Sequence, residues 1–144
     1  MKSDLSVTVK RYVPAPPDRA FRYWTDAQHL QRWWGPEGVT CPEASIDLRV
    51  GGTYRIGNSM PNGSIIWIHG VFESVDPPNQ IVFSWAVGLD SEPSERVIVR
   101  FDPSGVGTEV VVIHALIVNE AVLKEHEAGW IGCLAGLASY SESA

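Results

Sequence analysis

The chain has 144 residues, of which 44% are hydrophobic and 19% are charged, and its net charge is -6 at pH 7. This length fits a single domain spanning residues 1–144 that can bury roughly two-thirds of its unfolded surface. Because the protein is acidic and its eleven Lys and Arg residues are scattered, nucleic acid is not an expected partner.

The first predicted strand covers residues 5–12, where Leu5, Val7 and Val9 alternate with polar side chains. A pair of prolines then favours a helix start, and the short apolar face of residues 16–24 predicts a helix. A second short helix is expected over residues 26–34, ended by the Gly-Pro pair that follows. Together these two segments predict a helical hairpin.

The pattern from residue 44 onward is that of strands separated by short turns rich in Gly, Pro, Asn and Asp. Such turns favour consecutive antiparallel hairpins, and no helix between the strands is available for parallel pairing. The predicted strands are Ala44–Leu48, Gly52–Gly57, Ser64–Val75, Gln80–Val87, Glu95–Phe101 and Thr108–Leu116.

Alternation of side chains assigns faces to several of these strands. Arg96 and Arg100 mark the solvent side of one strand, so Val97 and Val99 face inward. The same alternation turns Val112 and His114 of the last strand inward, and Ser84 indicates that its neighbours Phe83 and Trp85 do the same. The strand that contains Trp67 and His69 is apolar in both phases, so it leaves their direction open.

The last predicted element is a helix from Asn119 to Ser141. Asn119 is a plausible N-cap, and an apolar stripe includes Leu123, Trp130 and Leu134. Glycines inside a helix each cost about 0.8 to 1 kcal/mol relative to alanine, so packing against the sheet must stabilise this segment. The predicted fold is therefore α+β, with a curved antiparallel sheet of six to seven strands around a long C-terminal helix.

Gly129, Gly132 and Gly136 are predicted to lie on the side of this helix away from Trp130, together with two alanines. A face of small residues allows another backbone to approach closely. We therefore expect this face to pack against a backbone, with a homodimer as one way to provide it.

The sequence indicates a cytoplasmic protein with no membrane partner. No apolar run approaches the roughly 18 to 20 residues of a membrane span, and MKSDLSVTVK lacks the apolar core of a signal peptide. Cys41 and Cys133 form no CxxC pair, so we interpret them as reduced thiols in the core.

Several motifs in one order resemble the homologues of the heat-shock-protein-90 ATPase activator, in the START and Bet v 1-like superfamily. The resemblance spans nearly the whole chain and rests on Ala15-Pro16 with Phe21, Trp33-Trp34-Gly35-Pro36, Asp47 to Tyr54, Gly70 with Asp76-Pro77-Pro78, Phe83-Ser84-Trp85, Thr108 to His114, and Gly129-Trp130. It implies a helix-grip fold, in which a curved sheet wraps a long C-terminal helix, often with a ligand cavity between them.

This resemblance favours a small hydrophobic or amphipathic ligand, bound without covalent chemistry, a cofactor or a fixed catalytic set. Tryptophans could be its walls, although large aromatic residues are as readily explained as core. The residues predicted to line the cavity are Trp34, Trp67, His69, Phe83, Trp85, Val99, Val112, His114, Trp130 and Leu134.

The spacing of the histidines and cysteines argues against a metal site or a thiol nucleophile, since HxH, HExxH and CxxC motifs are absent. His114 is interpreted as a hydrogen-bonded core histidine or as the polar anchor of a pocket. Asp47, Glu73 and Glu95 are the candidate carboxylates for acid–base chemistry, but the simpler interpretation is solvated charges at strand edges.

Three alternatives to ligand binding remain open. A co-chaperone-like protein would use an exposed apolar patch to bind a chaperone, although the second domain of the eukaryotic activator has no counterpart in this sequence. A cyclase or hydrolase of the same superfamily would need polar groups that converge in the cavity. A closed core with no ligand is the third alternative.

Overall fold

The computed structural model describes residues 5–36 and 38–143. In this part of the chain, seven strands form one antiparallel sheet with the order β1-β7-β6-β5-β4-β3-β2. The elements are β1 (Leu5–Val13), α1 (Pro17–Thr25), α2 (Ala27–Trp33), β2 (Thr40–Ile46), β3 (Thr53–Ser59), β4 (Ile65–Asp76), β5 (Gln80–Val87), β6 (Glu95–Ser104), β7 (Gly107–Ile117) and α3 (Glu120–Ser143).

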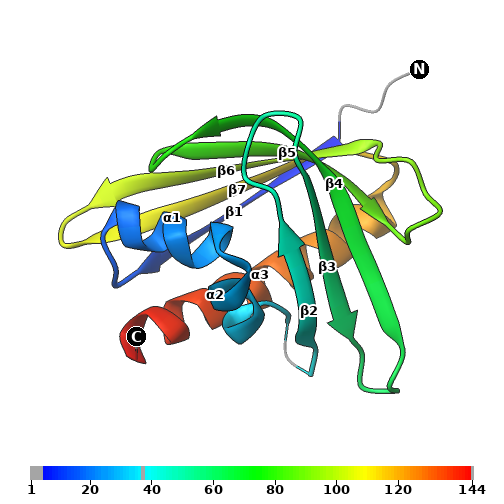
Figure 1. Cartoon of the computed structure of the whole chain (residues 1–144), viewed down its shortest axis with the longest axis horizontal. Coiled ribbons are helices and arrows are strands. Elements are labelled where there is room, and N and C mark those ends of the chain that lie inside the picture. The colour runs from blue at the N-terminus through cyan, green and yellow to red at the C-terminus, as the bar shows by residue number, and fades with distance from the viewer. Residues whose placement is uncertain (1–4, 37, 144) are drawn as a thin grey trace.

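Figure 1 shows the strands arching over the helices, with the long helix α3 crossing beneath the sheet and with α1 and α2 beside its C-terminal half. Each strand pair is antiparallel, and β1 forms one edge of the sheet by pairing with β7. This arrangement confirms the predicted helix-grip fold. None of the helices in the described part of the chain has the length and apolar character that a membrane span requires.

Local sequence accounts for the helix starts. The Asp26 carboxylate accepts a hydrogen bond from the Gln28 backbone N–H at 2.9 Å and thereby caps α2. The Asn119 side chain accepts one from the Val122 N–H at 2.9 Å and caps α3. Both caps satisfy amide groups that have no partner inside the helix, and the predicted role of Asn119 is confirmed.

The alternation of side chains places the core on the helix side of the sheet. Val97, Val99 and Val112 are fully buried, as is His114, whereas Arg96 is exposed. The predicted faces of β6 and β7 are therefore confirmed. The strand that differs most from its predicted bounds is β2, which covers Thr40–Ile46. It begins four residues earlier than expected, and it ends earlier because the chain turns from Asp47, whose N–H bonds to the Thr53 carbonyl at 2.9 Å.

The glycines of α3 do not share one back face. A Cβ atom on Gly136 would lie 2.5 Å from the carbonyl oxygen of Trp33, so a backbone does approach closely there, but it belongs to α2 of the same chain. Gly129 lines a pocket together with Trp130, and its predicted position on the far side of the helix is wrong. The homodimer stays a prediction.

Candidate functional site

A pocket of about 240 Å³ lies between the middle of α3 and strands β3, β4 and β5. Its walls are mainly aromatic and aliphatic, and its few polar side chains come from both the helix and the sheet. The lining residues are Trp34, Pro36, Val39, Asn58, Met60, Ile66, Ile68, Trp85, Val87, Glu125, His126, Gly129, Trp130 and Cys133.

Three tryptophans form the aromatic wall of this pocket. The ring centroids of Trp85 and Trp130 are 5.4 Å apart, and Trp34 stands almost perpendicular to Trp130 at 5.5 Å. The indole N–H of Trp34 donates to Oδ1 of Asn58 at 2.9 Å, which fixes the amide at the pocket wall. Each ring is at least 95% buried, so the wall is held by packing on its far side.

Gly129 leaves the helix side of the pocket open. A Cβ atom placed on this residue would have no neighbouring atom within 4 Å. A larger residue would therefore project into empty space, which makes the absent side chain one source of the pocket's volume. A glycine inside a helix destabilises it relative to alanine, and no close contact at this position requires a glycine.

A continuous hydrogen-bonded chain of four side chains begins at Trp130 of the aromatic wall, and we call it the Trp–His–Glu–His chain. Trp130 donates from Nε1 to Nδ1 of His114 at 3.0 Å. The Nε2 atoms of His114 and His126 each lie 2.8 Å from Oε1 of Glu95. The two imidazole rings stack with centroids 4.0 Å apart and an angle of 15° between their planes.

Strand register and helix periodicity bring these four residues together. Glu95 is directly opposite Trp85, and His114 is directly opposite Val97, two residues beyond Glu95. Glu95 and His114 are therefore diagonal neighbours on the same face of adjacent strands. On α3, His126 precedes Trp130 by one helical turn, so both side chains point toward that face.

The hydrogen-bond donors fix the position of the protons. An indole nitrogen can only donate, so Nδ1 of His114 must accept and a neutral His114 carries its proton on Nε2. An ionised carboxylate can only accept, so Nε2 of His126 also carries a proton. Nδ1 of a neutral His126 then keeps a free lone pair, and none of the described residues bonds to that atom.

Burial and hydrogen bonding agree with these protonation states. Burial lowers the pKa of His114, and its hydrogen bond to Glu95 offsets this only in part. Burial raises the pKa of Glu95, but the hydrogen bonds and charges of both histidines outweigh it and bring the pKa to about 2. At neutral pH, Glu95 is therefore ionised and His114 is neutral.

Glu95, His114 and His126 are close enough to hold a metal ion, since one ligand atom from each lies within 4.8 Å of the others. A histidine ligates through a nitrogen lone pair and usually donates a hydrogen bond from its other nitrogen. The Trp130 N–H occupies Nδ1 of His114 and leaves the proton on Nε2, the nitrogen that faces Glu95. This tautomer is the opposite of the one that a metal at Nε2 requires.

Of the residues predicted to line the cavity, Trp34, Trp85 and Trp130 line the pocket. His114 lies behind it and is fully buried. Val99, Val112 and Leu134 belong to the packed core, and Phe83 borders a separate void of about 20 Å³.

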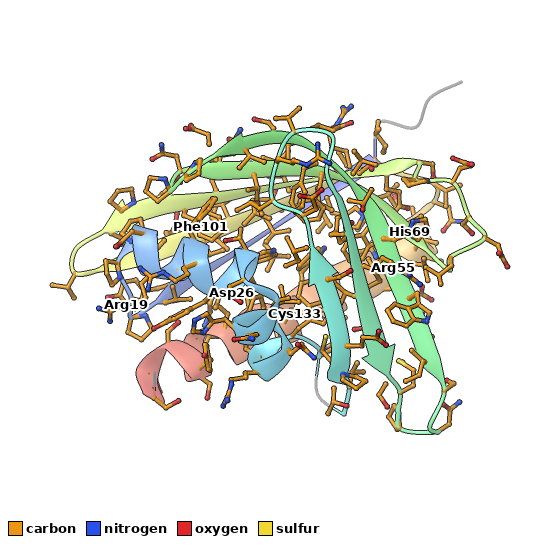
Figure 2. All side chains as sticks on the ribbon, viewed as in Figure 1. Arg19, Asp26, Arg55, His69, Phe101 and Cys133 are labelled. Carbon is orange, nitrogen blue, oxygen red and sulfur yellow. The ribbon has the colours of Figure 1, made fainter. Side chains whose placement is uncertain are left out.

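The prediction is wrong for Trp67 and His69. Inward positions on β4 are held by Ile68 and Phe72, which are buried, so the alternate residues Trp67 and His69 point to the outer face. Arg55 lies over the Trp67 ring at 4.9 Å, and the His69 Nε2–H donates to the Gly88 carbonyl at 2.9 Å. Figure 2 shows Arg55 on β3 and His69 on β4, to the right of Cys133 of α3.

Sequence reasoning missed Asn58, His126 and the role of Glu95. Alternation did contain the pattern for Glu95, because it lies two residues before the inward-facing Val97 and shares its face. Its side chain is only 13% exposed, so the interpretation as a solvated edge charge is wrong. The pairing of His126 with Glu95 depends on how α3 lies across the sheet, which no local pattern specifies.

The two cysteines are free and buried in the described structure, as predicted. Burial raises the pKa of the Cys133 thiol to about 12 and that of Cys41 to about 11. Because the thiolate is the reactive form, Cys133 is an inert part of the pocket wall at neutral pH.

Solved structures share this architecture. A crystal structure of a protein from Chromobacterium violaceum matches with a TM-score of 0.85 and 24% identity, covering 95% of this chain and 96% of that one. A protein from Nitrosomonas europaea matches with a TM-score of 0.83 and 20% identity, over 99% and 97% of the two chains. The AHSA1 protein from Silicibacter pomeroyi matches with a TM-score of 0.82 and 24% identity, over 94% and 96%.

These identities are all below 25%, so the solved structures establish the fold alone. No curated protein matches the sequence of this chain. Residues 14–142 match the model of the family described as Activator of Hsp90 ATPase homolog 1-like protein. The match covers nearly the whole chain, and the protein therefore belongs to this family of Hsp90 ATPase activator homologues.

Proposed function

We propose that this protein binds a small hydrophobic or amphipathic molecule in the pocket between α3 and the sheet, without covalent chemistry. The observation that carries the proposal is the gap of about 240 Å³ beside Gly129, walled by Trp34, Trp85 and Trp130. Concave sites with aromatic walls and a few polar groups are typical of small-molecule binding.

The size of the gap limits the ligand. Apolar cavities of about 150 Å³ in proteins can hold a benzene molecule. A pocket of about 240 Å³ therefore suits a ligand of about the size of a two-ring aromatic compound. Stacking between such a ligand and the indole rings would add to the burial of its apolar surface.

The polar groups and the rim favour an amphipathic ligand over a purely apolar one. Asn58 accepts a hydrogen bond through Oδ1, and its NH₂ group has no partner among the described residues. Ile66 and Val87 at the rim are exposed by 38% and 48%. A ligand that covered these side chains would bury apolar surface at the mouth while its polar group was bonded inside.

Filling the pocket tests this proposal. We expect Gly129→Leu to weaken binding of 2-methylnaphthalene, measured by fluorescence titration, at least tenfold, because the new side chain would project into the empty space. Ala128→Leu adds the same side chain to the exposed neighbouring position of α3 and serves as the matched control. Native mass spectrometry of freshly purified protein would identify a natural ligand in the wild type that is absent from Gly129→Leu.

Two results would contradict the proposal. One is the absence of measurable 2-methylnaphthalene binding to the wild type together with no co-purified molecule. The other is equal binding by Gly129→Leu and Ala128→Leu while both variants remain folded by circular dichroism.

A further inference from the structure

We propose that His126 is the hydrogen-bond acceptor of the pocket and that the ligand is an aromatic molecule carrying a hydroxyl group, whose O–H donates to Nδ1 of His126. This inference deepens the proposed function and rests on it. It assigns Glu95 and His114 as positioning residues, which set the proton on the far nitrogen of His126 without touching the ligand, while Trp130 holds His114 from the pocket wall itself.

The first support is the position of His126. It lines the pocket, and its side chain is 15% exposed, whereas the His114 side chain is completely buried. Of the two stacked imidazoles, only His126 is therefore accessible to a molecule in the pocket. Its Nε2–H is already committed to Glu95 at 2.8 Å, so Nδ1 is the atom left for a ligand.

The second support is the way in which the Trp–His–Glu–His chain fixes this nitrogen as an acceptor. A carboxylate that accepts from one imidazole nitrogen holds the tautomer and makes the other nitrogen more basic. Oε1 of Glu95 accepts from both histidines, and the second of them is locked by Trp130. The tautomer of His126 is therefore set by Glu95, which is held in turn by His114 and, through His114, by Trp130.

The chemistry of Nδ1 then selects the ligand. A lone pair requires a donor, and a deprotonated carboxylic acid has none and would face the nearby carboxylates of Glu95 and Glu125. A phenolic or enolic O–H is more acidic than an aliphatic alcohol and is the stronger donor. Its ring also matches the tryptophan wall, so an aromatic hydroxyl compound satisfies both kinds of surface.

Three probes of nearly equal shape separate the possibilities: 2-naphthol, which carries the donor; 2-methylnaphthalene, which lacks it; and 2-naphthoate, which is an anion. In fluorescence titrations at pH 7.5 we expect the wild type to bind 2-naphthol about 3- to 10-fold more tightly than 2-methylnaphthalene, the range of one net hydrogen bond. Binding of 2-naphthoate should be the weakest.

Variants test the assignment to His126. His126→Leu should remove the preference for 2-naphthol and leave the affinity for 2-methylnaphthalene within about twofold. Glu95→Gln should reduce the preference, because a neutral amide supports the basic Nδ1 less than a carboxylate does. Glu127→Gln, which neutralises an exposed carboxylate of α3 that does not line the pocket, is the matched control and should retain the preference.

Nitrogen NMR of the histidine rings provides a further test, because the ring resonances would not respond to the ligand if His126 had a purely structural role. In the ligand-free protein both rings should carry the proton on Nε2, and addition of 2-naphthol should shift the Nδ1 resonance of His126 but not its counterpart in His114. A proton on Nδ1 of His126 in the free protein would overturn the inference, as would a stoichiometric Zn²⁺ complex that forms in the wild type and not in Glu95→Gln.

The binding results distinguish the two proposals. Equal affinity for 2-naphthol and 2-methylnaphthalene in the wild type, or a preference that survives in His126→Leu, would overturn the role of His126 while leaving the pocket a binding site. If 2-naphthoate bound most tightly of the three probes, this result would also overturn the role of His126 while leaving the pocket a binding site. A wild type that binds none of the three probes would overturn both proposals.

Discussion

The two ends of the space beneath the sheet are built from the same kinds of residue, but one end is filled by side chains and the other contains a pocket. At one end, Phe101 meets Phe21 edge to face at 5.2 Å and Trp24 at 6.1 Å, and all three are buried. At the other end, Trp85 and Trp130 border a gap of about 240 Å³. Aromatic content therefore does not distinguish a core from a binding site, whereas the way in which the facing helix fills the space does.

Truncation of side chains at the two ends should have the most unequal effects. Phe101→Ala removes a ring that is 1% exposed, and we expect the free energy of unfolding to fall by about 3 to 5 kcal/mol. Met60→Ala changes a partly exposed side chain that already borders the pocket, and the expected loss is below about 1 kcal/mol. Urea unfolding of the ligand-free protein measures both, and similar losses would show that the pocket end is packed as tightly as the closed end.

Gly129 and Gly136 of α3 provide the next test, because they occupy the two environments on one helix. Gly136→Ala would place a Cβ atom 2.5 Å from the Trp33 carbonyl oxygen, and we expect a loss of about 1 to 3 kcal/mol from the forced backbone shift. Gly129→Ala meets no atom within 4 Å and should stabilise the protein by up to about 1 kcal/mol through helix propensity. Thermal unfolding of the pair gives the signs, and equal signs would contradict the difference between the two ends.

Much of the fold could be predicted because it follows from local patterns. Hairpin turns, alternation in β6 and β7, and the cap at Asn119 each depend on a few neighbouring residues. The direction of Trp67 could not be predicted in this way, since its strand is apolar on both faces and only packing chooses between them. The glycines of α3 likewise have different roles that depend on whether α2 or the pocket faces each one.

The site was less predictable than the fold because its parts belong to different levels of structure. His114 and Trp130 follow from strand and helix periodicity, and both were expected to face inward. Glu95 shares the inward parity of Val97, but a charged residue at a strand end has a simpler explanation until a partner is known. That partner is His126 on α3, and its position depends on the docking of the helix against the sheet.

The acid dependence of stability separates the two ends further, because the described titratable groups whose pKa values are lowered, His114 and Glu95, lie at the pocket end. Burial lowers the pKa of His114 below its ordinary value of 6.5. Below pH 6.5 the unfolded chain therefore takes up a proton that the native protein does not, and stability decreases as the pH falls. One such proton corresponds to a slope of up to about 1.4 kcal/mol per pH unit.

Glu95 adds a second decrease at lower pH. Its pKa is about 2 in the folded protein against an ordinary value of 4.5, so its contribution to stability is complete above pH 4.5 and is lost as the pH falls toward 2. Urea unfolding between pH 7.5 and 5 should show the first decrease in the wild type, and His114→Gln should flatten it even though the variant is less stable at pH 7.5. An unchanged slope in His114→Gln would mean that the His114 pKa is not lowered in the native state, and that burial does not hold this ring neutral.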